Sequence, residues 1–319
     1  MSPSESTEPW QDPAEVAHVA ALGGGVIGRS WTALFLAAGK SVALYDPDPT
    51  AEDRVREAVE RAWPVLRDLG LTAQPHPSSR LEVCDDPRAA VEGAGFVQES
   101  VPERLGLKHG LYELIEPVLG GTTVVASSAS GLTLSELQGG WADPVRLVLG
   151  HPFNPPHLIP LVEVMGNERS DPRAVPWTRR FYETLGKVTI EVRREVPGHV
   201  ANRLQAALWR EAIHLVNEGV AGVEDIDIAV SAGPGLRWAA MGPTLLFHLG
   251  AGEGGLAKFC ERYAESFHRW WDDLGDPRLD PPTVERLVLG LAQATGDAPV
   301  DELARQRDAL IQSFIAAKR

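Results

Sequence analysis

The sequence predicts an α/β protein in which a doubly wound sheet domain precedes an all-α domain. Three observations lead to this prediction. Short β-branched runs alternate with stretches of helical periodicity in the first part of the chain, as in a parallel sheet covered by helices on both faces. A glycine-rich loop follows the first of these runs. After Pro197 only helical periodicity remains, and we therefore expect a domain boundary there.

The chain organises into three parts on this reading. Residues 1–15 are polar, acidic and proline-containing, which predicts a disordered tail. Residues 16–196 form the sheet domain, with strands at 18–22, 41–46, 81–84, 95–99, 122–127, 146–150, 161–165 and 187–192, and helices at 26–39, 51–69, 107–119 and 172–185. Residues 197–319 form the helical domain, with helices at 199–218, 223–232, 243–249, 253–274, 282–294 and 300–317.

Composition excludes several classes of protein. The 319 residues are 44% hydrophobic and 23% charged, which is typical of a globular protein with a core. The net charge of −14 argues against a nucleic-acid partner. No apolar run approaches the roughly 20 residues that span a bilayer, and the N-terminus has no secretory h-region. The two cysteines, Cys84 and Cys260, have no metal-like spacing. We expect no metal site, reduced thiols and a cytoplasmic location.

The glycine-rich loop has the features of a dinucleotide site. It follows a predicted strand, opens a predicted helix, and reads Gly23-Gly24-Gly25-Val26-Ile27-Gly28. In this Rossmann-type arrangement Gly23 permits the tight turn, Gly25 the approach of a pyrophosphate and Gly28 close helix packing. Asp46 ends the second strand, where a carboxylate binds a ribose diol and repels a 2′-phosphate. We therefore predict NAD, with NADP disfavoured. The alternative is an ordinary glycine turn with a solvated Asp46.

A second stretch, "GHPFNPPHLIPLVEV" at 150–164, suggests proton transfer. His151 directly follows a predicted strand, at the sheet edge where ligands bind in doubly wound folds. Glu163, on the next strand, is placed to accept the other ring N–H and fix the tautomer. The pair then serves as acid and base for an alcohol and its ketone. The alternative is a salt-bridged pair in the core.

Several motifs together carry a family resemblance. The stretches "VAALGGGVIG", "VQESVPERLGLK", "ASSASGLTL", "GHPFNPPHLIPLVEV" and "VPGHVANRL" resemble the L-3-hydroxyacyl-CoA dehydrogenase superfamily over about residues 18–250. The helical part, with "GPGLRWAAMGPTLLFHLG", is most similar to the branch of lambda-crystallin, L-gulonate 3-dehydrogenase and L-carnitine dehydrogenase. The resemblance implies a dehydrogenase that interconverts a 3-hydroxy acid, or a related secondary alcohol, and its 3-keto form. It also implies a homodimer through the helical domain.

The resemblance assigns further roles by position. Ser130 would hydrogen-bond the substrate oxygen, Asn202 would hold the substrate or nicotinamide, and Asn154 would shape the same pocket. Glu103 and Lys108 match positions near the nicotinamide ribose and the cofactor. From the residues alone, Ser130 also fits ordinary turn chemistry. Asn202 and Lys108 also fit a helix surface.

The substrate class remains open at this point. Arg237 lies beside Trp238 in "GLRWAAMG" and would pair with a free carboxylate, or else cap a helix or link the two domains. No lysine lies between Lys40 and Lys108, where the acyl-CoA members carry one that contacts CoA, although arginines there could replace it. We therefore favour a small, carboxylate-bearing substrate over a CoA thioester. The aromatic-rich "HRWWDDLG" at 268–275 fits either a pocket wall or an interface.

Alternative functions follow from the same features. They are a 3-hydroxyacyl-CoA dehydrogenase, a stereospecific 3-ketoreductase of a polyketide or secondary-metabolite pathway, and a nucleotide-binding, crystallin-like structural protein. The intact set of predicted site residues argues against the structural protein. A Lys-dependent 3-hydroxyacid dehydrogenase is disfavoured because the predicted interdomain helix, "GHVANRLQAALWREAIHLVNEG", contains no lysine.

Overall fold

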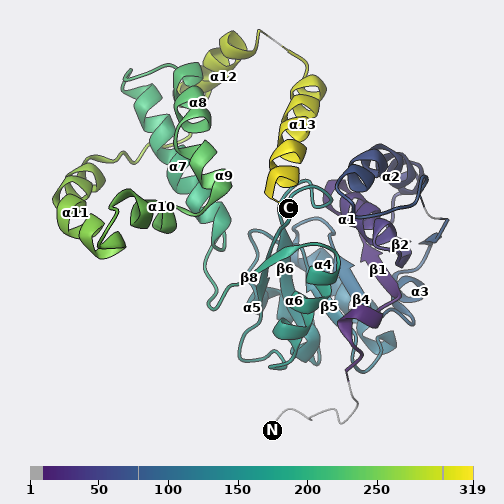
Figure 1. The fold of residues 1–319 in the computed structure, drawn as a ribbon. Coiled ribbons are helices and arrows are strands. Elements are labelled where there is room, and N and C mark those ends of the chain that lie inside the picture. Colours follow the sequence, from purple (N-terminus) through teal and green to yellow (C-terminus); the bar gives the residue numbers. More distant parts are fainter. Residues whose placement is uncertain (1–9, 78, 297, 319) are drawn as a thin grey trace. The chain divides into compact units, whose positions relative to one another are not determined.

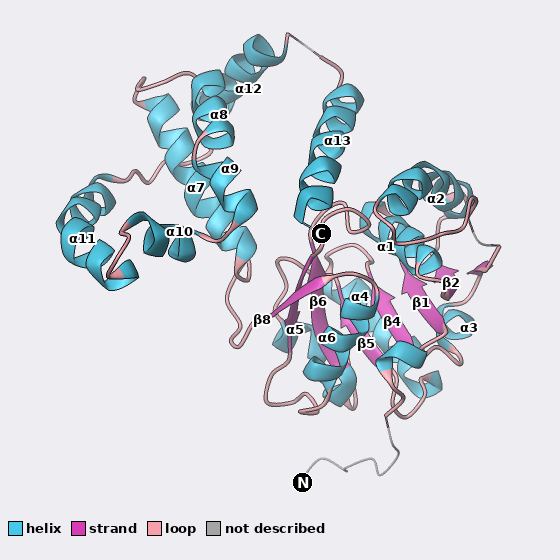
Figure 2. Cartoon of the chain, viewed as in Figure 1, coloured by secondary structure: helices cyan, strands magenta, loops and turns pink. Residues whose placement is uncertain are grey.

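The computed structural model describes residues 10–77, 79–296 and 298–318. The chain divides into two compact units, Met1–Val200 and Ala201–Arg319, so the boundary expected between residues 196 and 197 lies just before the observed division. The first unit carries a sheet with helices, and the described residues of the second form helices and turns (Figures 1 and 2). This is the α/β domain followed by an all-α domain that the sequence predicts.

The sheet has eight strands in the order β3-β2-β1-β4-β5-β6-β7-β8. The strands are β1 His18–Leu22, β2 Ser41–Tyr45, β3 Leu81–Cys84, β4 Phe96–Glu99, β5 Val124–Ser127, β6 Leu147–Pro152, β7 Leu161–Met165 and β8 Val188–Glu191. Strand order reverses between β1 and β4, because β1 pairs with both β2 and β4 in parallel. Such a switch point is where doubly wound sheets bind their ligands.

The expectation of a wholly parallel sheet is wrong at one place. Strand β7 runs antiparallel to β6, and β8 then runs parallel to β7. The reason is the length of the connection, since the eight residues at 153–160 are too few for a parallel crossover, which needs about a dozen or more. The antiparallel return places His151 directly opposite Glu163 in the register.

Helices cover both faces of the sheet and bury two separate cores. Helices α1 Val26–Ala37, α2 Ala51–Asp68 and α6 Ala174–Thr184 supply the first core, which contains Trp31 and Phe181. Helices α3 Pro87–Val91, α4 Leu105–Ile115 and α5 Leu134–Gln138 supply the second, which contains Tyr112. Each large apolar side chain so buried contributes about 1.5–3 kcal/mol to folding. This burial holds the loops at the carboxyl ends of the strands in fixed positions.

The N-terminal segment differs from the sequence-based expectation. Residues 1–9 lie outside the described residues, but residues 10–15 are not a disordered tail. Pro13–Glu15 form a short 3-10 helix capped by Asp12, and the ring of Trp10 packs edge-on against Trp177 of α6. The indole N–H of Trp177 also donates to the Gln11 carbonyl. An aromatic contact and a hydrogen bond therefore offset the unfavourable composition of this segment.

The second unit is made of amphipathic helices with little buried apolar surface. They are α7 Ala201–Asn217, α8 Val223–Ala232, α9 Pro234–Ala240, α10 Pro243–Gly250, α11 Gly255–Asp273, α12 Pro281–Thr295 and α13 Val300–Lys318. Helix α9 was not expected from the sequence, and it begins on a proline, which is preorganised for the first turn. Across the described residues, no helix is long and apolar enough to cross a membrane.

Candidate active site

The glycine loop between β1 and α1 has the geometry of a phosphate-binding turn. Gly23 has a φ of 99°, and a Cβ there would lie 2.8 Å from the Ser100 carbonyl oxygen. A Cβ on Gly28 would lie 1.7 Å from the Gly23 carbonyl oxygen, so only glycine permits this approach. Gly25 caps α1 without any side-chain hydrogen bond and meets nothing within 4 Å. The first N–H groups of α1 therefore remain available to an anionic group.

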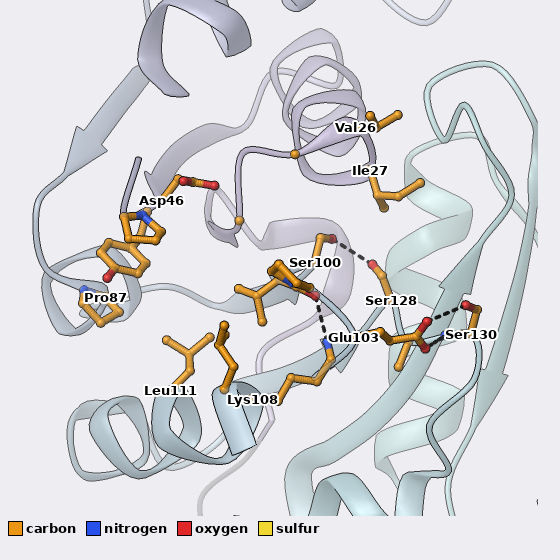
Figure 3. A pocket seen from close by; sticks show the side chains of 18 of the residues that line it. Val26, Ile27, Asp46, Pro87, Ser100, Glu103, Lys108, Leu111, Ser128 and Ser130 are labelled. Atoms are coloured by element: carbon orange, nitrogen blue, oxygen red, sulfur yellow. Dashed lines mark hydrogen bonds between the residues drawn. The ribbon is translucent and has the colours of Figure 1, made fainter. Parts of the chain in front are cut away.

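A cavity of about 650 Å³ lies beside this loop. Figure 3 shows its wall, which combines residues from the carboxyl ends of several strands with one face of α4. The described lining residues include Gly23, Gly25, Val26, Ile27, Asp46, Ser100, Glu103, Lys108, Ser128 and Ser130. Seven of the eight positions predicted to bind the cofactor thus line one cavity; the eighth, Gly28, lies in the first turn of α1 and is not among the lining residues. The residues present fit a dinucleotide.

Asp46 lies at the end of β2 and is held by backbone donors. Its Oδ2 accepts the Gly24 N–H at 2.6 Å, and its Oδ1 accepts the Asp48 N–H at 2.9 Å. These bonds fix the carboxylate at the rim of the cavity, where it meets the turn. The nearby Arg54 is engaged with Asp48 at 2.9 Å. A carboxylate in this position accepts hydrogen bonds and repels a phosphate.

A fully buried polar cluster supports the cavity from behind. Lys108 Nζ lies 2.5 Å from Glu99 Oε1, and both side chains are almost completely buried. Glu99 Oε2 accepts hydrogen bonds from the Tyr112 hydroxyl at 2.7 Å and the Ser127 hydroxyl at 2.6 Å. Burial and the adjacent Glu99 charge raise the pKa of Tyr112 well above its usual value. The alternative of Lys108 as a helix-surface charge is therefore wrong, because its partner Glu99 draws it inward.

Sequence reasoning missed the other members of this cluster. Glu99 closes β4 and Ser127 closes β5. Next to them, the hydroxyls of Ser100 and Ser128 are 2.9 Å apart and both residues line the cavity. These residues could have been recognised in the sequence as polar residues at the carboxyl ends of buried parallel strands, where such sheets bind their ligands.

Glu103 and Ser130 form one unit. The Ser130 hydroxyl donates to Glu103 Oε2 at 2.9 Å, and Oε1 accepts the N–H groups of Ser130 at 2.6 Å and Gly131 at 2.5 Å (Figure 3). Burial alone would raise the pKa of Glu103, but the hydrogen bonds from Gly131 and Ser130 outweigh it and lower the pKa. Glu103 is therefore a carboxylate that organises the loop after β5.

His151 and Glu163 are joined across the antiparallel pair β6–β7. Nδ1 of His151 lies 2.8 Å from Glu163 Oε2, and both side chains are buried. Glu163 Oε1 accepts the Val200 N–H at 2.9 Å. The His151 ring contacts the ring of Phe153, with centroids 5.3 Å apart, and the ring of His199, with centroids 5.1 Å apart. The carboxylate fixes Nδ1 as the protonated nitrogen, which leaves the Nε2 lone pair to accept a proton.

The remaining predicted residues belong to other elements of the chain. Asn154 is exposed, precedes a cis peptide bond to Pro155, and does not line the cavity. Asn202 belongs to α7 and Arg237 to α9, both in the second unit. Trp270 and Trp271 lie on α11 and are exposed. No group of three or more His, Cys, Asp or Glu side chains with metal-binding geometry occurs among the described residues.

Comparison with known proteins agrees with this geometry. The family model for the NAD binding domain of 3-hydroxyacyl-CoA dehydrogenase matches residues 18–196, and the model for its C-terminal domain matches residues 198–285. An L-carnitine dehydrogenase of Streptomyces coelicolor is 49% identical over 93% of both chains. One of Pseudomonas aeruginosa is 43% identical over 96% of this chain and 95% of its own.

A solved structure shows the same architecture. The NAD+-dependent 5-formyl-3-hydroxy-2-methylpyridine 4-carboxylic acid 5-dehydrogenase superimposes with a TM-score of 0.80 at 30% identity, covering 95% of this chain and 98% of its own. Both domain matches, the relatives and the cavity point to one reaction class. The chain belongs to the 3-hydroxyacyl-CoA dehydrogenase family, as an oxidoreductase that uses a nicotinamide dinucleotide to interconvert a secondary alcohol and its ketone.

Proposed function

We propose that the chain is an NAD-dependent dehydrogenase of a free 3-hydroxy acid, and that L-carnitine is its substrate. The observation that carries the chemistry is the buried contact of His151 with Glu163 at 2.8 Å. The substrate follows from the 49% identity to an L-carnitine dehydrogenase over nearly the whole chain. L-carnitine is itself a 3-hydroxy acid with a free carboxylate, the class favoured by the sequence.

His151 is the proton acceptor in alcohol oxidation and the donor in ketone reduction. Glu163 accepts Nδ1–H, so Nε2 is the atom that takes the hydroxyl proton, and the carboxylate stabilises the resulting imidazolium. A nicotinamide dinucleotide held by the glycine turn and Asp46 would supply the hydride chemistry. Ser130 donates its own proton to Glu103, which leaves its oxygen lone pairs for the substrate hydroxyl. Asn202 and Asn154 contact the substrate by analogy of position.

NAD is the dinucleotide that the cavity favours. Asp46 places a negative charge beside the turn, and its oxygens accept the Gly24 and Asp48 N–H groups. The 2′-phosphate of NADP at this place would be repelled by the Asp46 carboxylate. Arg54, which is close in sequence, is paired with Asp48 and so does not neutralise the phosphate. We expect turnover with NAD to exceed turnover with NADP by at least about tenfold in kcat/KM, since one unfavourable charge pair costs more than about 1.4 kcal/mol.

Two neighbouring residues of the second unit have side chains whose chemistry suits a zwitterionic substrate. Arg237 and Trp238 lie next to each other on α9. A guanidinium pairs with a carboxylate through two hydrogen bonds, and an indole face attracts a quaternary ammonium group. These two groups match the two charged ends of L-carnitine. A CoA thioester would call for a cluster of cations instead.

We also propose a homodimer through the helical unit. Its described helices bury only three large apolar side chains, those of Ile213, Val216 and Ile226. Large apolar residues that stay exposed include Leu204, Leu208, Trp209, Leu245, Leu249, Trp270, Trp271, Val288, Leu289 and Leu291. A self-complementary partner would cover such surface. Sedimentation equilibrium that gives the mass of a single 34.5 kDa chain would exclude the dimer.

The decisive assay follows NADH absorbance with purified protein. The panel holds L-carnitine, L-gulonate, 3-hydroxybutyrate, 3-hydroxybutyryl-CoA and an aromatic 3-keto acid, each with NAD(H) and NADP(H). We expect the highest kcat/KM for L-carnitine with NAD. A higher value for the CoA ester would overturn the free-acid assignment. NADH binding without turnover of any compound would favour a structural role for the protein.

A further inference from the structure

His199 stands out from the other histidines by its backbone. It is the only residue other than glycine for which the described structure records a positive φ, and this angle is 49°. The left-handed region costs a residue with a Cβ atom roughly 1–2 kcal/mol. Sequence periodicity placed this residue inside a helix, but it lies in the turn after Pro197 and α7 begins only at Ala201. Strained backbone of this kind gathers at functional sites.

This turn connects three parts of the reaction centre. The His199 ring packs against His151, with centroids 5.1 Å apart and planes inclined by 56°. The next residue, Val200, donates its N–H to Glu163 at 2.9 Å. His199 Nε2 lies 3.3 Å from the carbonyl oxygen of Ala129, which lines the cavity next to Ser130. The turn contacts both members of the acid–base pair, His151 through the His199 ring and Glu163 through the Val200 N–H. These two contacts explain why the strained backbone angle of His199 is retained.

The His199 ring is buried, which disfavours its charged form. Burial lowers the pKa of His199; the Ala129 carbonyl opposes this shift, and the nearby His151 adds to it. The carboxylates of Glu163 and Glu103, which also face the ring, act in the opposite direction without reversing it. A carbonyl only accepts hydrogen bonds, so Nε2 carries the ring proton. Nδ1 is then an acceptor, and among the residues described it has no partner.

Protonation of His199 would place a second positive charge beside His151. Two cations in a buried site repel each other strongly, and the imidazolium that His151 forms during alcohol oxidation would be destabilised. A neutral ring at this position adds no such repulsion, so His151 can gain a proton while the ring still fills the space beside it. Packing against His199 and Phe153 also restricts rotation of the His151 ring.

We propose that His199 is a positioning residue for proton transfer, which holds the His151 ring against Glu163 with Nε2 presented to the substrate and remains uncharged while His151 gains its proton. This inference rests on the acid–base role proposed for His151. His199 acts through His151 and not on the substrate. A displacement of about 1 Å in a reacting group reduces turnover by up to roughly a hundredfold, which sets the size of the effect to expect.

The first test uses the unaltered protein. Nitrogen-15 NMR of histidine-labelled protein at neutral pH distinguishes neutral from protonated imidazole and identifies the protonated nitrogen. We expect His199 to be neutral with the proton on Nε2, and His151 to carry its proton on Nδ1. Signals are assigned by their loss in His199→Asn and His151→Gln. A protonated His199 at neutral pH, or a proton on its Nδ1, would overturn the proposal without reference to any variant's activity.

The second test separates packing from backbone strain. His199→Phe keeps a ring beside His151 but loses both nitrogens, whereas His199→Asn tolerates the positive φ but loses the ring. The matched control is His109→Phe, since His109 also contacts a backbone carbonyl, that of Glu136, and does not line the cavity. Far-UV circular dichroism and thermal melting identify the folded variants.

The outcomes are distinct. We expect kcat to fall about tenfold to a hundredfold in His199→Asn, with the Kd for NADH and the KM within about twofold of the unaltered protein. In His199→Asn the NMR signal of His151 should no longer show a single tautomer. The control His109→Phe should change neither kcat nor the His151 signal. A folded His199→Asn with full kcat and an unchanged His151 signal would refute the inference. Failure of the proposed function would look different from failure of the His199 inference. In that case the unaltered protein would not oxidise L-carnitine, or His151→Gln would stay active. The NMR result would still decide the tautomer and charge of His199.

Discussion

Replacing Glu163 by glutamine tests the acid–base pair with the smallest possible change. The substitution preserves the size of the side chain and removes its charge. In the structure Oε1 accepts the Val200 N–H at 2.9 Å and Oε2 faces His151 Nδ1 at 2.8 Å. A glutamine has one oxygen and one NH2 group for these two places. One of the two contacts must therefore change.

Both orientations of the amide carry a cost that can be worked out. If the NH2 group faces Val200, two donors oppose each other in a buried site, which costs about 1–3 kcal/mol. If the oxygen faces Val200, the NH2 group faces Nδ1 of His151 and moves the ring proton to Nε2. Nε2 then cannot accept the substrate proton. Loss of a positioned base lowers the rate by roughly 10²–10⁴-fold, or about 3–5 kcal/mol of transition-state stabilisation.

The assay compares kcat of Glu163→Gln and the unaltered protein for alcohol oxidation, together with the Kd for NADH. We expect kcat to fall by at least about a hundredfold and the Kd to stay within about threefold. The control is Glu116→Gln, because Glu116 also accepts two backbone N–H groups, those of Ala142 and Asp143, and does not line the cavity. A Glu163→Gln variant with kcat within threefold of normal refutes the role of this pair.

Three further predictions follow from the structure. Gly28→Ala should raise the Kd for NADH at least about tenfold, because its Cβ would lie 1.7 Å from the Gly23 oxygen; Gly106→Ala, with open space around it, is the fluorescence-titration control. Asp46→Ala should weaken NADH binding and improve kcat/KM with NADP relative to NAD, and an unchanged ratio would remove Asp46 from the choice of cofactor. Burial lowers the pKa of Lys187 to about 7, whereas unfolded lysine titrates near 10.4. The unfolded chain thus binds more protons between these values, so the free energy of unfolding rises with pH there. Urea unfolding should show a rise of up to about 2–3 kcal/mol from about pH 7 to about pH 9 that Lys187→Met lacks; equal rises would contradict the shift.

Local sequence patterns were sufficient to predict those elements whose structure depends mainly on neighbouring residues in the chain. The first-unit strands lie within about two residues of the expected ranges, since each combines β-branched residues with a turn at its end. The glycine loop was predictable for the same reason. Helix α9 was missed because seven residues give too short a period to recognise.

Contacts between residues on different elements could not be predicted from local sequence patterns. The sequence left open whether Lys108 is a cofactor residue or a helix-surface charge; its partner Glu99, on strand β4, lies 2.5 Å away and is buried with it. The tail at 10–15 gained structure from Trp177, more than 160 residues away along the chain. His199 looked like one histidine among nine. Its burial and its contact with His151 arise where its turn meets strand β6 and the loop after β5.

The sequence by itself determined the two-domain class, the dinucleotide turn and eight of the nineteen described residues that line the cavity, because hydrophobic period and glycine chemistry act over a few neighbouring residues. Only the tertiary structure decided that β7 returns antiparallel, that Glu163 therefore lies opposite His151, and that His199 packs against this pair. Side chains this far apart in sequence are brought together by the burial of two cores on the faces of the sheet, and burial is a property of the whole fold.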